Sequence, residues 1–571
     1  MRPPAAWQAE ARQFRLLVGV SYRRLLDAAL ASRDVDAEQF ALWGTALLAT
    51  PPLYAAMIWP SRYPWLRRQG LDVLHTAVVS DRLFFVAWSL LVAVLVGALL
   101  WDALFPDRTD QQVLGVLPVR SRTVAAARLA AALTTVAVLL AAINLPAASL
   151  NALSGAVDPS VGRVPGIFIG QMVATVTAGM CAFSTLLVMR GAAAWLLGAA
   201  VASRIAVALQ FVSVLATFLG LMFLPGLLAV MMRQVLGGAG VPLPPVWFMG
   251  IYAWFAGPYS TVLAPLGVWA SGALAASVTL ALAVYVLPAR LAARRAIEAR
   301  DGGQGARWLL APLLAAGAVL RRPSARARYA FAVRSLTRSR RHLLIVASYL
   351  ALGVALGGVR VLSQGIRGRL SVDQPAAFLV VIPLILIFFL VLGLRAAFAV
   401  PTDLAANWAF RIVGPRSVLE SRSAARLAFY TVAVLPVLAV TVAVAGWQWG
   451  TGVGLRLGAM HLAAGVLLTE VALRGHESVP FTKSRALSTS SLKVGVALAI
   501  GLIYFVAFRF DGLQLWVLAT PSRTAGYVVT HLLVAVIVAV TGRRRSRTEL
   551  ATFDAPDDHA VTQLKLSEAS L

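Results

Sequence analysis

Long apolar runs recur along this chain, and they constrain its fold more than any other feature. A membrane-crossing α-helix needs roughly 17 to 25 mostly apolar residues, and runs of this length return throughout the sequence. Hydrophobic residues make up 59% of the 571 residues and charged residues only 13%, too apolar a balance for a water-soluble core to bury. The sequence therefore predicts an all-α polytopic membrane protein.

Twelve runs meet the length that a crossing needs. The first six are Ala41–Trp59, Leu83–Leu104, Leu129–Leu150, Gly166–Met189, Ile205–Met231 and Pro265–Leu287. The second six are Leu343–Val359, Ala377–Val400, Leu427–Gly446, Leu455–Leu473, Leu492–Phe508 and Ala525–Gly542. Because each set has an even number of spans, we expect two parallel six-helix halves related by an axis along the membrane normal.

The distribution of arginine sets the expected domains and orientation. We expect a first half over residues 1–288, a basic connector over 289–341, a second half over 342–542 and a tail over 543–571. Most of the 51 basic residues fall on the side of the two chain ends, which predicts that both termini are cytoplasmic. Ser61–Arg82, a predicted outer loop, runs against this pattern with four arginines. Either it is an interfacial segment, or the first run, which contains Pro51 and Pro52, does not fully cross.

Short motifs repeat in the same order in the two predicted halves. In the first half they are TD at Thr109–Asp110, ARLA at Ala127–Ala130 and TVAVL at Thr135–Leu139. In the second half they are TD at Thr402–Asp403, ARLA at Ala425–Ala428 and TVAVL at Thr431–Leu435. Each half also opens with a basic amphipathic stretch, from Ala11 and from Ala327, which is expected to lie along the inner membrane surface. The pattern predicts an internal repeat.

The segment LGVLPVRSRTVAAARLA, from Leu114 to Ala130, interrupts two apolar runs on the predicted cytoplasmic side. Apolar residues alternate with charges around a rigid proline, Pro118. A short helix with an apolar face and arginines at its end suits a groove on a cytoplasmic partner. The alternative is an interfacial helix that its arginines anchor to lipid phosphates.

With Asp110 before it and Arg128 within it, this segment resembles the coupling segment of permeases of the type-two ATP-binding-cassette exporters. Four further segments resemble those of large, largely uncharacterised bacterial permease-like proteins of this class. They are LPPVWFMGIYAWFAG from Leu243, LRAAFAVPTDLAANWAFRIVGPR from Leu394, VPFTKSR from Val479 and TFDAPDDHAVTQLKLS from Thr552. The resemblance implies a permease in the bacterial inner membrane, whose cytoplasmic segments transmit the closure of separate ATPase subunits to the spans.

The resemblance assigns the coupling to two sets of residues. The first set is Asp110, Leu114, Leu117, Pro118, Val119, Arg120 and Arg122. The matching place in the second half holds Asp403, Asn407, Trp408, Arg411, Pro415 and Arg416. The second set departs from the LPVR pattern, which leaves open whether both halves dock in the same way and would allow two non-identical ATPase contacts.

Aromatic residues gather in the segment from Leu243, on the predicted outer side. Those of interest are Trp247, Phe248, Tyr252 and Trp254. Such density at a membrane boundary is typical of an interfacial belt. By the resemblance, the same place holds short helices that dip back from the outer surface and close the pathway, as an outer gate.

The sequence contains no motif for nucleotide chemistry of its own. A P-loop places a lysine directly after a glycine, and none of the three lysines, Lys483, Lys493 and Lys565, follows one. ATP is therefore expected to bind to the partner, and we expect no cofactor, no metal and no enzymatic activity in this chain. The net charge of +27 is typical of arginines that face anionic membrane lipid, and we expect no nucleic-acid partner.

Three other functions remain open. A secondary or lipid transporter without an ATPase predicts ionisable residues deep in the spans, of which the sequence shows few. A membrane-embedded enzyme acting on a lipid-linked substrate predicts outer acidic residues, and Asp72, His75 and Asp81 share one predicted loop. A non-transporting scaffold could use the same docking segment.

Polar and small residues inside the predicted spans indicate how the helices pack. Asn144, Gln171, Gln210 and His461 fall deep in their runs, where we expect them to bond between helices rather than to line a pathway. Gly353 and Gly357 form a pair four residues apart that predicts a close helix contact.

Overall fold

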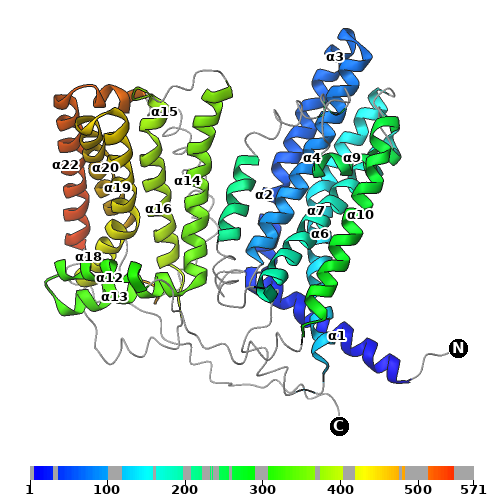
Figure 1. The fold of residues 1–571 in the computed structure, drawn as a ribbon, viewed down its shortest axis with the longest axis horizontal. Helices are drawn as coiled ribbons and strands as arrows, with labels where there is room; N and C mark the ends of the chain where they lie inside the picture. Colours follow the sequence, from blue (N-terminus) through cyan, green and yellow to red (C-terminus); the bar gives the residue numbers. More distant parts are fainter. Residues whose placement is uncertain are drawn as a thin grey trace. The chain divides into compact units, whose positions relative to one another are not determined.

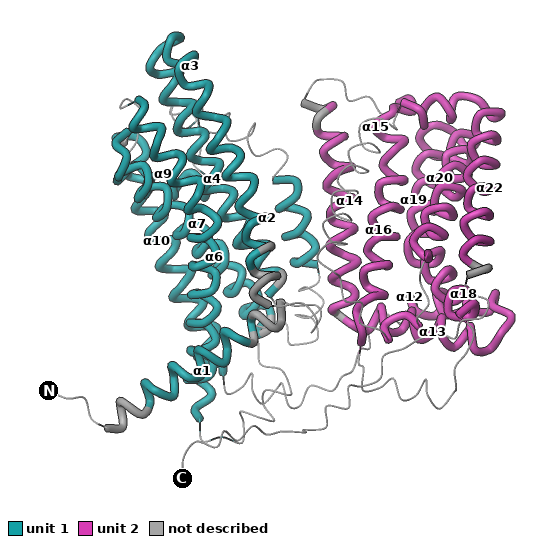
Figure 2. Tube along the Cα trace, turned by 180° about the vertical axis from the view of Figure 1, so that it is seen from behind, with its two compact units in different colours: residues 1–302 teal, residues 303–571 magenta. Residues whose placement is uncertain are grey.

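The computed structural model is built from helices. It describes residues 5–29, 37–100, 117, 119–158, 162–196, 208–220, 232, 235, 243–255, 260–289, 307–366, 373–402, 418–474, 479–482 and 512–545. Within these residues all regular structure is helical and no strand is present. The chain divides into two compact units, unit 1 over Met1–Gly302 and unit 2 over Gly303–Leu571 (Figure 2). The division falls inside the predicted connector, while the predicted domain boundaries stay a prediction.

Nine helices of the described residues are long and apolar enough to cross a membrane, as the prediction of an all-α polytopic membrane protein requires. They coincide with nine of the twelve predicted runs. Of the other three, Ala41–Trp59 is helical but is not among the nine. Ile205–Met231 contains the helix Ala208–Gly220, and Leu492–Phe508 lies outside the described residues. The number twelve stays a prediction.

Unit 1 is a bundle with α7 at its centre. Its helices are α1 (Ala5–Ala29), α2 (Ala37–Ile58), η1 (Trp59–Arg62), α3 (Tyr63–Gln69), α4 (Leu71–Leu99), α6 (Ser121–Val157), α7 (Val164–Leu196), α9 (Pro244–Phe255) and α10 (Ser260–Val286). Helix α7 packs against α4, α6, α9 and α10, while α1 and α2 pack against α6. In Figure 1, α1 lies obliquely at the lower ends of the long helices of this unit.

Most of the predicted outer loop Ser61–Arg82 is helical, while its place outside the membrane stays a prediction. The segment contains the short helices η1 and α3, a turn at Gly70 with φ 143°, and the first turns of α4. Helix α4 begins at Leu71, well before the predicted start at Leu83, because its early polar residues find partners inside the protein. Pro51 and Pro52 do not interrupt α2, which is continuous through both.

Unit 2 is a second bundle, with α20 at its centre. Its helices are α12 (Arg307–Ala315), η3 (Ala316–Val319), α13 (Pro323–Arg338), α14 (Arg340–Ile366), α15 (Ala377–Val380), α16 (Ile382–Phe398), α18 (Val418–Phe429), η5 (Tyr430–Val434), α19 (Leu435–Trp449), α20 (Thr451–Ala472) and α22 (Pro521–Arg545). Helix α20 packs against α16, α19 and α22, and α14 packs against α16. Figure 1 shows α12 and α13 lying across the lower ends of the long helices.

Helices α18, η5 and α19 form one apolar helix of 32 residues with a π-helical turn inside it. The wider turn at η5 ends just before Leu435 and Pro436. In a regular α-helix the ring of Pro436 would clash with the carbonyl group of Val432, four residues earlier. A π turn relieves this conflict and gives the helix a local irregularity of the kind found at functional sites.

The predicted polar contacts between helices are confirmed. The Asn144 side chain donates to Ser89 Oγ at 2.9 Å, from α6 to α4. Gln171 accepts from Asn151 at 3.0 Å, Gln210 donates to the Ala98 carbonyl at 2.5 Å, and His461 Nε2 lies 3.4 Å from Gln514 Oε1. These bonds join neighbouring helices, so they hold the bundles together.

The predicted close contact at the glycine pair is also confirmed. A Cβ atom at Gly353 would lie 3.2 Å from Phe389, and one at Gly357 would lie 3.3 Å from Ile382. Helix α14 therefore approaches α16 closely along this face.

Candidate functional site

The residues just before α6 present the described part of the first predicted coupling segment. Leu117 is 48% exposed, Val119 is half-buried, and Arg120 and Arg122 are exposed. The backbone already turns here, because the Val119 N–H donates to the Leu117 carbonyl at 2.7 Å. An exposed leucine beside two exposed arginines is accessible to a partner. Asp110, Leu114 and Pro118 lie outside the described residues.

Helix α1 packs against α6 next to this segment. Its buried face includes Leu25, whereas Leu16 and Val20 are 67% and 60% exposed. An ion pair joins Arg120 to Glu10 of α1 at 3.8 Å, with both side chains largely exposed. Solvent screens such a pair, so it fixes the segment only weakly.

The second predicted coupling set, Asp403, Asn407, Trp408, Arg411, Pro415 and Arg416, lies outside the described residues. Its flanks are described, and both contact the short segment Val479–Thr482. Before the set, the Thr402 N–H donates to the Phe481 carbonyl at 3.1 Å. After the set, Val418 packs with Val479 and Phe331. Both flanks of the second set therefore contact the segment Val479–Thr482, which we call the anchor.

The anchor has an unusual backbone. Phe481 adopts φ 64°, a left-handed conformation that is costly for a bulky residue. Its ring is fully buried, with centroid distances of 4.6 Å to His342, 5.0 Å to Phe398 and 6.4 Å to Phe331. His342 also donates from Nε2 to the Val400 carbonyl at 2.9 Å. Packing on several sides thus holds Phe481 in its strained conformation.

Helix α13 is bound to α18 and to the π turn that follows it. The Arg328 guanidinium donates to the Ser421 hydroxyl, and the Ser324 hydroxyl donates to Glu420 at 2.5 Å. The buried Tyr329 hydroxyl lies 2.5 Å from the Leu313 carbonyl and 3.1 Å from Thr431 Oγ1 in η5. Burial raises the pKa of Tyr329, so its hydroxyl keeps its proton near neutral pH. A displacement of α13 would therefore act directly on the π turn.

The four predicted gate residues belong to α9, a helix of 12 residues that is too short to cross a bilayer. Phe248 and Tyr252 are each 1% exposed and lie in the core of unit 1. Trp247 is half-buried, whereas Trp254 is 49% exposed and donates from Nε1 to the Ala264 carbonyl at 3.0 Å. An interfacial belt needs exposed rings, which Trp254 provides and Phe248 and Tyr252 do not, while the outer gate stays a prediction.

Helix α9 meets α10 backbone to backbone. A Cβ atom at Gly250 would lie 2.0 Å from the backbone nitrogen of Gly267. Only glycine fits at such a contact. The approach keeps the short helix tightly against α10.

A buried arginine beside α9 escaped the sequence prediction. Arg82 of α4 is 1% exposed, and its Nη2 lies 3.1 Å from Ser154 Oγ and 3.3 Å from the Asn151 carbonyl. Among the described residues, its Nε and Nη1 atoms have no hydrogen-bond partner, and Tyr252 lies within its electrostatic reach. The sequence signal was present, because an apolar helical pattern continues on both sides of Asp81–Arg82.

The predicted grouping of Asp72, His75 and Asp81 for an enzyme is not present. All three lie on α4 rather than in a loop. Nine residues separate the two aspartates, which places them about 180° apart around the helix. Asp81 forms an ion pair with Arg62 and accepts from the Tyr63 hydroxyl at 3.0 Å. Among the described residues, no group of three or more His, Cys, Asp or Glu side chains could hold a metal ion.

No protein-family model, curated protein or solved structure matches this chain.

Proposed function

We propose that this chain is the permease subunit of an ATP-driven exporter in the bacterial inner membrane, powered by separate ATPase subunits that bind its cytoplasmic segments. In this proposal twelve spans form two parallel six-helix halves, and both termini are cytoplasmic. The spans form the pathway, and ATP binds to the partner.

The exposed start of α6 is the observation that carries this proposal. Leu117 and Arg120 stand accessible immediately before a continuous helix of 37 residues. A rigid helix transmits displacement along its axis, so a partner that moves this segment also moves the span. Helix α1 packs against α6 and so supports the same helix.

A corresponding set of contacts in unit 2 supports the proposal. The amphipathic helix α13 packs on α18 as α1 packs on α6. Its bond from Tyr329 to Thr431 links it to the π turn, where a long helix bends most readily. Force on the second coupling segment would reach this turn through Val418, the first residue of α18.

Helix α9 would form the outer gate. It is short, buried and in backbone contact with α10, so a movement of α10 would carry it along. Rocking of the spans would in this way open or close the pathway.

Charge reversal at the start of α6 tests the proposal. In membranes that contain the chain and its partner, Arg120→Glu should reduce ATP hydrolysis that depends on this chain by at least about tenfold, since a misplaced like charge at an interface costs several kcal/mol. Arg163, which is exposed just before α7 at the opposite end of α6, gives the matched control, Arg163→Glu. We expect the control to keep its activity. Equal activity of the two variants would refute the assignment of the segment.

A second candidate function, transport without an ATPase, is favoured by one observation. Arg82 is a buried arginine in a candidate membrane span, with two nitrogen atoms that lack hydrogen-bond partners in the described part of the chain. Buried ionisable residues in membrane helices mark substrate pathways. An anionic substrate could bind there without any nucleotide.

Reconstitution separates the two candidates. The purified chain alone in liposomes should show no transport under an ion gradient if it needs an ATPase. Gradient-driven flux that Arg82→Gln abolishes would instead favour the second candidate and contradict the first.

A further inference from the structure

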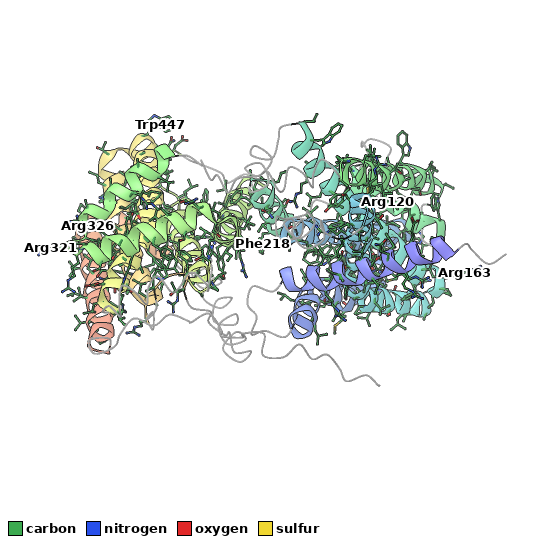
Figure 3. The ribbon with its side chains drawn as sticks, turned by 90° about the horizontal axis from the view of Figure 1, so that it is seen from below. Arg120, Arg163, Phe218, Arg321, Arg326 and Trp447 are labelled. Atoms are coloured by element: carbon green, nitrogen blue, oxygen red, sulfur yellow. The ribbon has the colours of Figure 1, made fainter. Side chains whose placement is uncertain are left out.

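Unit 2 contains a cavity of about 630 Å³ between the start of α13, the first turns of α18 and the end of α22. Its polar lining consists of Arg321, Arg322, Arg422, Arg426, Glu420 and Ser423. Figure 3 labels Arg321 and Arg326 side by side at one edge of unit 2, along the helices that cross the ends of the spans. The proposed coupling and gating do not use this cavity.

The cavity carries an excess of positive charge. Glu420 forms an ion pair with Arg322 at 3.1 Å, and Arg426 binds both oxygens of Glu470, with Nη2 3.0 Å from Oε2. Among the residues that line the cavity, four are arginines and one, Glu420, is a carboxylate. So basic a lining favours an anionic ligand.

One of the arginines is held in a built position. Arg422 is 3% exposed, and a Cβ atom at Gly542 of α22 would lie 2.5 Å from its Nη2 atom. The absence of a side chain at Gly542 therefore makes room for the guanidinium group. Arg422 and Arg426 are one turn apart on α18 and lie on the same face.

The remaining lining is apolar and leads to the membrane helices. Leu320, Leu419 and Val540 complete the wall, and Val540 is 40% exposed. Helices α18 and α22 belong to candidate spans. The cavity thus combines guanidinium groups with an apolar side at the ends of membrane helices, where phospholipid headgroups lie.

We propose that this cavity binds the phosphate of an anionic phospholipid headgroup. Guanidinium groups bind phosphate through paired hydrogen bonds, and basic pockets between membrane helices hold anionic headgroups. The volume suits a headgroup, since ligand pockets commonly measure about 300 to 1,000 Å³. The apolar wall favours a lipid over free phosphate, because it covers the start of an acyl chain.

The test is lipid retention by the full-length protein purified in detergent. The protein is mixed with equal amounts of phosphatidylglycerol and phosphatidylcholine, and bound lipid is counted by native mass spectrometry. We expect phosphatidylglycerol to be retained preferentially. Arg321→Gln should reduce its retention about fivefold and Arg321→Glu about twentyfold, since one basic residue contributes about 1 kcal/mol to such binding.

Arg334→Gln provides the matched control. Arg334 is exposed on α13 and does not line the cavity, so this variant removes the same charge from the same helix. We expect it to change retention less than about twofold. An equal loss in both variants, or equal retention of the two lipids by the unaltered protein, would overturn the proposal.

Competition with inorganic phosphate distinguishes a phospholipid headgroup from a soluble phosphate as the ligand of the cavity. At a tenfold excess over lipid it should leave phosphatidylglycerol bound, because it cannot contact the apolar wall. Displacement of the lipid would assign the cavity to a soluble phosphate and would contradict the lipid proposal.

Discussion

The starts of α6 and α18 share sequence but differ in structure. Both begin near Ser-Arg and both contain ARLA, yet Arg122 and Arg128 are six residues apart, whereas Arg422 and Arg426 are four apart. Four residues return to the same face of a helix, while six residues end about 120° away. Arg122 is therefore exposed and Arg128 is 6% exposed, whereas Arg422 and Arg426 both line one cavity.

The spacing of the two arginines, six residues in α6 and four in α18, distinguishes two kinds of site. At α18 the two arginines are largely buried and line a partly open cavity, and carboxylates hold two of the arginines that line it. At α6 the described part of the segment is exposed, and the exposed pair from Arg120 to Glu10 holds it weakly. An exposed segment suits a protein partner, and a cavity lined by arginines suits an anionic group. We infer that the two starts perform different tasks.

The shared motif TVAVL also differs in structure between its two copies. Thr135–Leu139 is regular helix within α6, whereas Thr431–Val434, the first four residues of the second copy, fall in the π turn. The motif itself does not decide the geometry. The residue that follows the motif differs, because it is Leu140 in α6 and Pro436 in α19, and the π turn makes room for the proline ring.

The largest expected effect tests the site at the start of α18. Arg426→Ala leaves Glu470, with a side chain only 5% exposed, as an unpaired charge. The free energy of unfolding should fall by about 3 to 5 kcal/mol, as measured by denaturant unfolding in detergent. The control Arg426→Leu/Glu470→Leu should recover most of this loss, because it removes both charges. A double variant as unstable as the single one would show that the pair is not the cause.

The next effect compares one close helix contact from each unit. Gly250→Ala forces a Cβ atom against the backbone of Gly267, and it should lower stability by about 1 to 3 kcal/mol in thermal unfolding. Gly272→Ala on α10 meets no atom within 4 Å and should raise stability by up to about 1 kcal/mol. In unit 2, Gly353→Ala faces only side-chain atoms at 3.2 Å or more and should cost less than Gly250→Ala. The reverse order would contradict the backbone contact.

A smaller effect concerns the link from α13 to the π turn. Tyr329→Phe removes the bonds to Leu313 and Thr431, and it should lower the free energy of unfolding by about 1 to 2 kcal/mol. Hydrogen exchange should rise locally in η5. Tyr22→Phe, at a tyrosine of α1 that is 45% exposed, serves as the control and should change neither quantity. If hydrogen exchange in η5 stayed unaltered, the bonds of Tyr329 would not stabilise the π turn, and the proposed link from α13 would be contradicted.

The smallest effect belongs to the exposed segment at the start of α6. Glu10→Gln removes an exposed pair and should change stability by less than about 0.5 kcal/mol. A loss comparable to that of Arg426→Ala would abolish the contrast between the starts of α6 and α18. Thermal unfolding of both variants under one condition gives the comparison.

The sequence predicts the helices and many of their contacts because those depend on local pattern. Apolar runs located nine candidate spans, and the buried amides of Asn144 and Gln171 bond between helices as expected. The start of α4 was misplaced, because Asp81 and Arg82 resemble loop residues until Arg62, Tyr63 and Ser154 are brought beside them. Tertiary partners, which a local pattern does not contain, decide such cases.

The candidate sites also differ in how far the sequence predicts them. The exposure of Leu117 and Arg120 agrees with the prediction of a docking segment, while the docking itself stays a prediction. The cavity in unit 2 could not be predicted, because its lining comes from three segments far apart in the sequence, near residues 320, 420 and 540. Its charge balance also depends on which arginine meets which carboxylate.

Site-specific crosslinking in living cells tests the central claim most directly. A photoreactive amino acid replaces Leu117 at the start of α6 or, in the control, Val157, which is 84% exposed at the far end of the same helix. The account predicts that irradiation joins position 117, and not position 157, to an ATP-binding protein. Crosslinks from position 117 to lipid alone, or the same protein adduct from both positions, would contradict it.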